Sequence, residues 1–192
     1  MRKRISLKIS IFMCLFVGLF ATGCNQKRTK SQKTVHLNFG RNVYTLDPRK
    51  AEEESSQNIT LMLYDGLVRL DANGKLGLAL AQSYTLSSDK KTYTFTLKEA
   101  KWSDGSPITA YDFEYSWKKI LSPDFDSPIK HELYIFEGGK QASKGELAFD
   151  AVGIKALDAK TLKVTLEYPA PYFLDMIAST AYFYPTKAGI NE

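Results

Sequence analysis

Residues Thr92–Leu121 read TYTFTLKEAKWSDGSPITAYDFEYSWKKIL, and this stretch predicts a strand, a tight turn and a capped helix. Its first six residues alternate threonine with apolar side chains, which is the period-two pattern of a half-buried strand; the apolar residues are Tyr93, Phe95 and Leu97. The sequence SDGSP at 103–107 then ends the strand. Asp and Ser can bond their own backbone, Gly accepts a positive φ and Pro fixes φ, so this segment predicts a turn.

The helix that follows has a recognisable start and end. Thr109 is suited to the N-cap, and Asp112 three residues later can accept from its backbone, as in a capping box with Asp in place of Glu. One apolar face is expected from the spacing of Phe113, Trp117, Ile120 and Leu121. Pro123 should end the helix. No side chain here indicates catalysis, so we interpret the stretch as a folding unit.

Outside this stretch, the patterns predict a mixture of hairpins and helices. On its N-terminal side we expect a strand over 35–39, a helix from Ser55 or Ser56 to about Asp65 that buries Ile59, Met62 and Leu63, a strand at 67–70, a hairpin turn at 71–74 and a connecting segment at 76–84. On its C-terminal side we expect an aromatic cluster at 133–136, strands at 152–156 and 162–166, and a helix starting at 173. Without regular βαβ spacing, these elements favour an α+β or mixed α/β fold.

The net charge of +5 does not indicate a nucleic-acid partner, because the positive charge lies at the N-terminus. All 21 acidic side chains lie beyond residue 33, whereas eight of the 26 basic ones precede residue 34: Arg2, Lys3, Arg4, Lys8, Lys27, Arg28, Lys30 and Lys33. The remainder of the chain is therefore slightly acidic, which argues against DNA or RNA binding.

The first 23 residues are typical of an export signal. MRKR is followed by an apolar run from about Ile9 to Ala21, which has the length of a signal-peptide core and is short for a membrane span. Ala21-Thr22-Gly23-Cys24 resembles a bacterial lipobox, in which Cys24 would be lipidated and would become the first mature residue. Two alternatives remain open: ordinary cleavage with an unmodified Cys24, or an uncleaved anchor. The basic residues 24–33 would form a solvated tether.

No motif indicates an enzyme, a metal site or a cofactor. The sequence lacks GxSxG, HExxH, CxxC and phosphate-loop patterns. Glu52, Glu53 and Glu54 are three adjacent carboxylates, but their spacing does not match a calcium loop.

Several motifs together identify a family resemblance. The segments KWSDGSPITA at 101–110, DF at 112–113 and YSW at 115–117 resemble the signature region of the family 5 extracellular solute-binding proteins, the oligopeptide- and dipeptide-binding receptors of ABC importers. Further matching segments are LDP at 46–48, LYDGL at 63–67, LAQSY at 80–84, VGIKALD at 152–158, TLKVTL at 161–166 and PAPYF at 169–173.

The resemblance implies a type II periplasmic-binding-protein clamp, in which an extended peptide lies between two lobes and pairs with strand edges. It implies a signal peptide at 1–23, a tether at 24–33, the start of the first lobe at 34–50, an accessory domain at 51–165 and a return into the first lobe at 166–192. Family members are more than twice as long as this chain, so the second lobe is expected to be missing.

The same resemblance assigns peptide contacts to Glu52, Glu53 and Glu54, which follow the LDP segment. Glu52 stands where the oligopeptide receptors also carry Glu, whereas Glu53 and Glu54 replace small or apolar residues. Ile129 follows Ser127-Pro128 at a position where those receptors carry a peptide-contacting Tyr.

We therefore expect a non-enzymatic, lipid-anchored protein of the cell envelope that captures extended oligopeptides and delivers them to ABC permease subunits. Two alternatives remain: a truncated remnant that binds no peptide, and a membrane-anchored module that binds other proteins. No cofactor is expected.

Overall fold

The computed structural model describes residues 34–189, which belong to two compact units with their boundary between Asn38 and Phe39. The predicted signal segment, the tether and Cys24 lie outside the described residues. The elements of the second unit, in chain order, are η1 Pro48–Lys50, α2 Glu54–Leu63, β1 Val68–Leu70, β2 Leu76–Leu78, β3 Ala81–Leu86, β4 Thr92–Leu97, α3 Ala110–Leu121, η2 Lys130–Ile135, α4 Gly139–Ser143, η3 Phe149–Ala151, β5 Ile154–Ala156, β6 Thr161–Thr165, α5 Phe173–Ser179 and η4 Ala181–Phe183.

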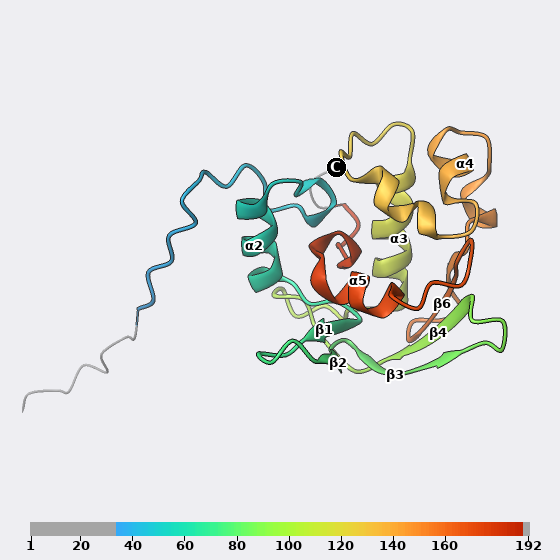
Figure 1. Cartoon of the computed structure of the whole chain (residues 1–192), viewed down its shortest axis with the longest axis horizontal. Coiled ribbons are helices and arrows are strands. Elements are labelled where there is room, and N and C mark those ends of the chain that lie inside the picture. Colours follow the sequence, from blue (N-terminus) through green and yellow to red (C-terminus); the bar gives the residue numbers. More distant parts are fainter. Residues whose placement is uncertain (1–33, 190–192) are drawn as a thin grey trace, which may run out of the picture. The chain divides into compact units, whose positions relative to one another are not determined.

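Two antiparallel sheets form one layer of this unit, and helices form the other (Figure 1). The larger sheet has the strand order β3-β4-β6-β5, and the smaller one is the β1–β2 hairpin. Helix α3 packs against β5 and β6, while α5 packs against β1. No helix within residues 34–189 has both the length and the apolar character needed to cross a membrane.

The strand, turn and helix predicted over Thr92–Leu121 are confirmed. Tyr93, Phe95 and Leu97 on β4 are all buried. Thr109 and Asp112 form the capping box of α3, in which the Thr109 backbone N–H donates to Asp112 Oδ2 over 2.7 Å. The predicted apolar face of α3 is fully buried, and the helix ends two residues before Pro123.

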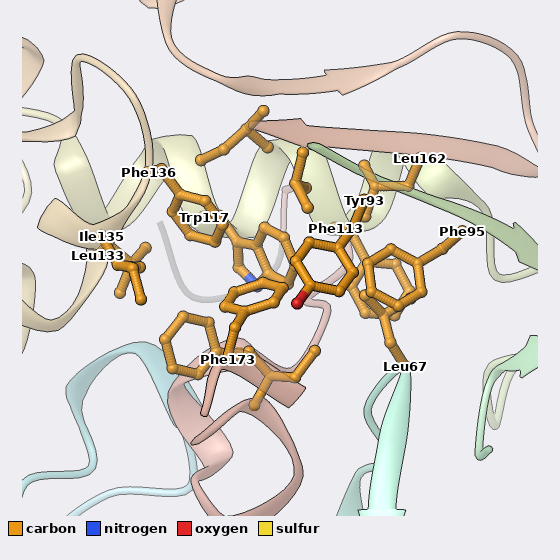
Figure 2. Packing of buried hydrophobic residues seen from close by; sticks show 14 of the residues in the cluster. Leu67, Tyr93, Phe95, Phe113, Trp117, Leu133, Ile135, Phe136, Leu162 and Phe173 are labelled. Atoms are coloured by element: carbon orange, nitrogen blue, oxygen red, sulfur yellow. The ribbon is translucent and has the colours of Figure 1, made fainter. Parts of the chain in front are cut away.

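An aromatic stack at the centre of the core joins α3 to segments that follow it in sequence (Figure 2). The Trp117 ring stacks on Phe136 with ring centroids 5.1 Å apart, and Phe173 and Phe183 each meet the Phe136 ring edge-on. Because these rings belong to α3, the end of η2, α5 and η4, the C-terminal segment shares one core with the central helix and sheet.

Two predictions about where strands lie are wrong. Residues 35–39 form no strand in the structure, although their apolar side chains alternate. Alternation gives β-propensity, but a strand exists only when a neighbour takes its backbone hydrogen bonds. Conversely, residues 76–84 are not merely a connecting segment, since they contain β2 and the first part of β3. The side chains of β3 beyond Ala81 are exposed on both faces, so burial does not alternate along this strand. Residues 81–86 are a strand because their backbone pairs with β4.

The orientation predicted for the helix after the acidic run is also wrong. Helix α2 begins at Glu54 with Glu53 as N-cap, so Ser55 and Ser56 lie inside its first turn and do not cap it. Its buried residues are Ser55, Ser56 and Thr60, whereas Met62 and Leu63 are 58% and 59% exposed. The polar face turns inward because neighbouring backbone groups bond to its hydroxyls, and these contacts satisfy the buried polar atoms.

Candidate functional site

The three acidic residues predicted to contact peptide lie at the junction between η1 and α2. Glu52 and Glu54 are exposed, and Glu53 is half-buried. Glu53 has an extended backbone, with φ −83° and ψ 151°, and Glu54 starts the helix. The structure therefore places all three residues together on a short segment that changes from extended to helical geometry.

Serine and glutamine side chains hold this segment in place. Ser56 Oγ accepts from the backbone N–H groups of Tyr44 and Thr45 over 3.1 and 3.2 Å, and it donates to the Glu53 carboxylate. Gln57 Nε2 donates to the Glu52 carbonyl over 2.9 Å and also to the Tyr182 hydroxyl. The first turn of α2 is thus tied both to the extended segment before it and to η4.

The electrostatics of this segment favour retained negative charge. The hydrogen bond from Ser56 lowers the pKa of Glu53, so its carboxylate stays ionised at neutral pH. The amino-terminal end of a helix also favours nearby anions. Three carboxylates at the start of α2 can attract an ammonium group, although the helix end alone is a sufficient structural reason for their presence.

Two neighbouring features bear on other roles for this region. Within residues 34–189, no group of three or more His, Cys, Asp or Glu side chains could hold a metal ion. Ile129, at the position where the family resemblance implies a peptide-contacting Tyr, is 2% exposed and belongs to the core. Its side chain therefore contributes packing and is not available at the surface.

A buried ion pair next to the acidic segment is a feature that the sequence patterns did not predict. Arg49 Nη2 lies 2.9 Å from Asp47 Oδ2, and Arg49 Nε lies 2.9 Å from Asp47 Oδ1, with both side chains nearly inaccessible. Burial opposes the charge on Arg49, but the hydrogen bonds and charge of Asp47 outweigh it and raise the pKa of Arg49. An Asp directly before Pro48 is a typical N-cap, so the sequence could have identified Asp47 as a structural residue.

The guanidinium of Arg49 also lies 4.9 Å from the centre of the Phe125 ring, and Ser127 Oγ donates to the Arg49 carbonyl over 2.7 Å. These contacts connect the segment before α2 to the loop after α3. They explain why the ion pair can be buried, since each charged group has several partners.

A cavity of about 770 Å³ lies elsewhere in the described residues, and none of the three acidic residues lines it. It is bounded by residues 46–49, the end of α2, the turn at 100–108 and residues 185–187. A second hollow of about 570 Å³ lies beside the end of α2 and shares Tyr64 and Asp65 with the first. The acidic segment and the cavities are therefore separate candidate sites.

Comparison with known proteins gives matches to several oligopeptide- and dipeptide-binding proteins. Over 180 residues the chain is 37% identical to the oligopeptide-binding protein OppA of Bacillus subtilis, covering 93% of this chain and 33% of that protein. The substrate-binding domain of an oligopeptide ABC transporter from Bacillus anthracis has a TM-score of 0.73 at 35% identity, covering 76% of this chain and 28% of the other. For Listeria monocytogenes OppA bound to peptide the TM-score is 0.70 at 33% identity, with 73% and 28% covered.

The chain therefore spans about a third of the length of the relatives that it matches. The expected mixed α/β fold is confirmed by these matches to type II binding proteins. The family model of the bacterial extracellular solute-binding proteins, family 5 Middle, matches residues 75–192, and solute-binding proteins of this kind are transport components that are not enzymes. On this evidence the chain belongs to the family 5 bacterial extracellular solute-binding proteins.

Proposed function

We propose that this chain contributes the peptide-contacting N-terminal part of a solute-binding component that captures extended oligopeptides for an ABC importer. Family membership supports the proposal, together with the exposed Glu52 and Glu54 on a segment that hydrogen bonds from Ser56 and Gln57 hold in place. An extended peptide would place its backbone along this segment and its ammonium group near the carboxylates. Because these 192 residues span about a third of the relatives' length, they should bind peptide with low affinity when tested by themselves.

The proposal also includes delivery to permease subunits and a lipid anchor at Cys24. Relatives include periplasmic oligopeptide-binding proteins such as the OppA of Escherichia coli, so an envelope location is consistent with the family. The apolar run before Cys24 and the lipobox-like ATGC support the anchor. Cys24→Ser should move the protein from the detergent phase to the aqueous phase, and unchanged partitioning would overturn the anchor.

Calorimetric titration of the 192-residue chain with a mixed pool of tripeptides to pentapeptides tests peptide capture. We expect weak, saturable binding, with Glu52→Gln and Glu54→Gln each reducing affinity up to about fivefold, since exposed ion pairs are worth up to about 1 kcal/mol. Glu146→Gln, on an exposed residue after α4, is the matched control and should leave the affinity unchanged.

Two results would contradict this proposal. Absence of binding heat from a chain that still unfolds cooperatively would favour a non-binding remnant. Equal affinities for the wild type, Glu52→Gln and Glu54→Gln would place any peptide contact elsewhere on the chain.

A further inference from the structure

The two edges of the four-stranded sheet are covered differently. Strand β5 at one edge has three residues, and the backbone N–H of Ala156 on it donates to Glu114 Oε2 over 2.8 Å. Strand β3 at the other edge has six residues, and within residues 34–189 no strand pairs with its outer side (Figure 1). An edge strand of this kind offers its outward N–H and C=O groups to another strand.

The ladder between β3 and β4 shows which backbone groups point outward. Ser87 N–H donates to the Thr92 carbonyl over 2.9 Å, so these two residues form a hydrogen-bonded pair at the end of the hairpin. Hydrogen-bonded and non-hydrogen-bonded pairs alternate along an antiparallel ladder. By this alternation Thr85 directs its backbone groups to β4, whereas Tyr84 and Leu86 direct theirs to the outer edge.

The side chains of the same two residues extend the apolar core to this edge. The Tyr84 ring centroid lies 6.1 Å from that of Tyr93 and 5.7 Å from that of Phe95, and both of these rings are buried. Leu86 is opposite Tyr93 in the ladder, so it lies on the same face of the sheet. Tyr84 and Leu86 are 39% and 42% exposed. Apolar surface is therefore open to solvent where the outward backbone groups lie.

The strand carries no charge that would oppose pairing with a copy of itself. Its residues are AQSYTL, without a charged residue or a proline, although protected edge strands commonly carry one or the other. A register shift occurs between Ala81 and Ser83, and residues 83–86 pair regularly with β4. A two-fold axis sets the strand against itself, so a charge on it would meet its own copy. The uncharged edge is thus electrostatically compatible with a second copy.

The outward groups also select one register for such a pair. With Thr85 on the two-fold axis, Tyr84 of each copy is opposite Leu86 of the other, and the two residues exchange N–H···O=C bonds. Their side chains meet on the core-facing side of the sheet, and the Thr85 hydroxyls meet on the opposite side. A register centred on Tyr84 would instead set the polar Gln82 against Leu86.

We propose that the outer edge of β3 binds a second copy of this chain, so that the two four-stranded sheets join into one antiparallel sheet across a two-fold axis at Thr85. Pairing along one short strand covers less area than the roughly 1,200–2,000 Å² of a stable interface, so the dimer is weak, with a dissociation constant of about 0.1–1 mM. The proposal uses none of the acidic residues at 52–54 and is independent of peptide capture.

A disulfide on the axis tests the register. The full chain carries Cys14→Ser and Cys24→Ser, so that each introduced cysteine is the only one. In Thr85→Cys the two copies place their Cα atoms about 4.5 Å apart, inside the disulfide range of about 4.4–6.8 Å, and oxidation should give mainly a covalent dimer. Thr96→Cys, at an exposed position one strand further in, and Ser83→Cys, away from the axis, are the controls and should each give less than about a fifth as much.

Sedimentation equilibrium of the full chain between about 10 µM and 1 mM measures the association without a cross-link. Thr85→Lys sets two ammonium groups against each other across the axis and should weaken the dimer at least about tenfold. Thr96→Lys adds the same charge to the same face of the sheet, away from the edge, and should change the dissociation constant by less than about twofold. Glu52→Gln should leave the association unchanged.

Three outcomes would overturn the proposal: a wild-type chain that is monomeric at about 1 mM, equal cross-linking of Thr85→Cys and Thr96→Cys, or association that Thr85→Lys does not weaken. A monomeric chain whose β3 resonances shift on addition of an extended peptide would assign the edge to that other occupant, and it would overturn the dimer as well.

Discussion

Single residues in this chain often differ in role from what their type suggests. Asp47 and Arg49 are charged yet buried, whereas Met62 and Leu63 are apolar yet exposed. Glu52 and Glu54, the residues predicted to contact peptide, are exposed at the start of a helix, and Glu53 is held by a serine. In each case the neighbours in space determine the role, because they decide which polar groups can be satisfied.

Tyr184 gives a pH-dependent prediction at this scale. Burial, with a contribution from the charge of Asp65, raises the pKa of Tyr184 to about 12. In the unfolded chain the Tyr184 hydroxyl ionises near pH 10. Its contribution to the free energy of unfolding is therefore complete below pH 10, and up to about 2 kcal/mol of it is lost as the pH rises toward 12. Tyr184→Phe should reduce this alkaline loss of stability, measured by urea unfolding between pH 9 and 12.

The matched control for Tyr184 is Tyr111→Phe, on a residue that is 53% exposed. Burial also raises the pKa of Tyr64, Tyr93 and Tyr182, so part of the alkaline loss should persist in Tyr184→Phe. An identical pH dependence in wild type and Tyr184→Phe would show that this hydroxyl ionises equally well in the folded chain.

At the scale of elements, the apolar spacing predicts the buried side chains correctly when a strand or helix buries its apolar face. Helix α3 and strands β4, β5 and β6 follow this rule, and their apolar spacing matches their burial. Strand β3 and helix α2 do not, since β3 is exposed at the sheet edge and α2 buries its hydroxyl face. An amphipathic pattern alone therefore does not decide which face of an element is buried.

Because α2 buries its hydroxyl face, we expect substitutions on its polar face to cost more stability than substitutions on its apolar face. Ser56→Ala should cost about 1–3 kcal/mol, because the N–H groups of Tyr44 and Thr45 lose their acceptor. Met62→Gln should change the free energy of unfolding by less than about 0.5 kcal/mol, because its side chain is exposed. Urea unfolding of both variants measures these values. A large cost for Met62→Gln with none for Ser56→Ala would mean that the apolar face is the buried one.

At the scale of the whole molecule, the core crosses the boundary expected at residue 165. Trp117 lies in the region assigned to an accessory domain, and Phe183 lies in the segment assigned to the first lobe, yet their ring centroids are 5.9 Å apart with the planes nearly perpendicular. A shared aromatic core is expected to couple the unfolding of both regions.

Phe183→Leu therefore should lower the stability of the whole unit by about 1–2 kcal/mol. Tryptophan fluorescence and far-ultraviolet circular dichroism should report one common transition at the lower denaturant concentration. Tyr168→Leu is the control: because Tyr168 is 50% exposed, this substitution should leave the unfolding midpoint almost unchanged. A fluorescence transition that stays at its wild-type midpoint in Phe183→Leu would support an independently folding domain at 51–165.

The sequence by itself determined the mixed α/β class and the position of most elements, because those depend on local spacing of apolar residues, turn residues and caps, and its motifs carried the resemblance to the family. The tertiary structure alone decided which face of α2 is buried, how Asp47 and Arg49 pair, and where the cavity bounded by Trp102 and Thr186 forms. The physical reason is that the buried face of α2 and the cavity are made by groups distant in sequence, while the local Asp47–Arg49 pair is covered by Phe125 and Ser127 from the loop after α3.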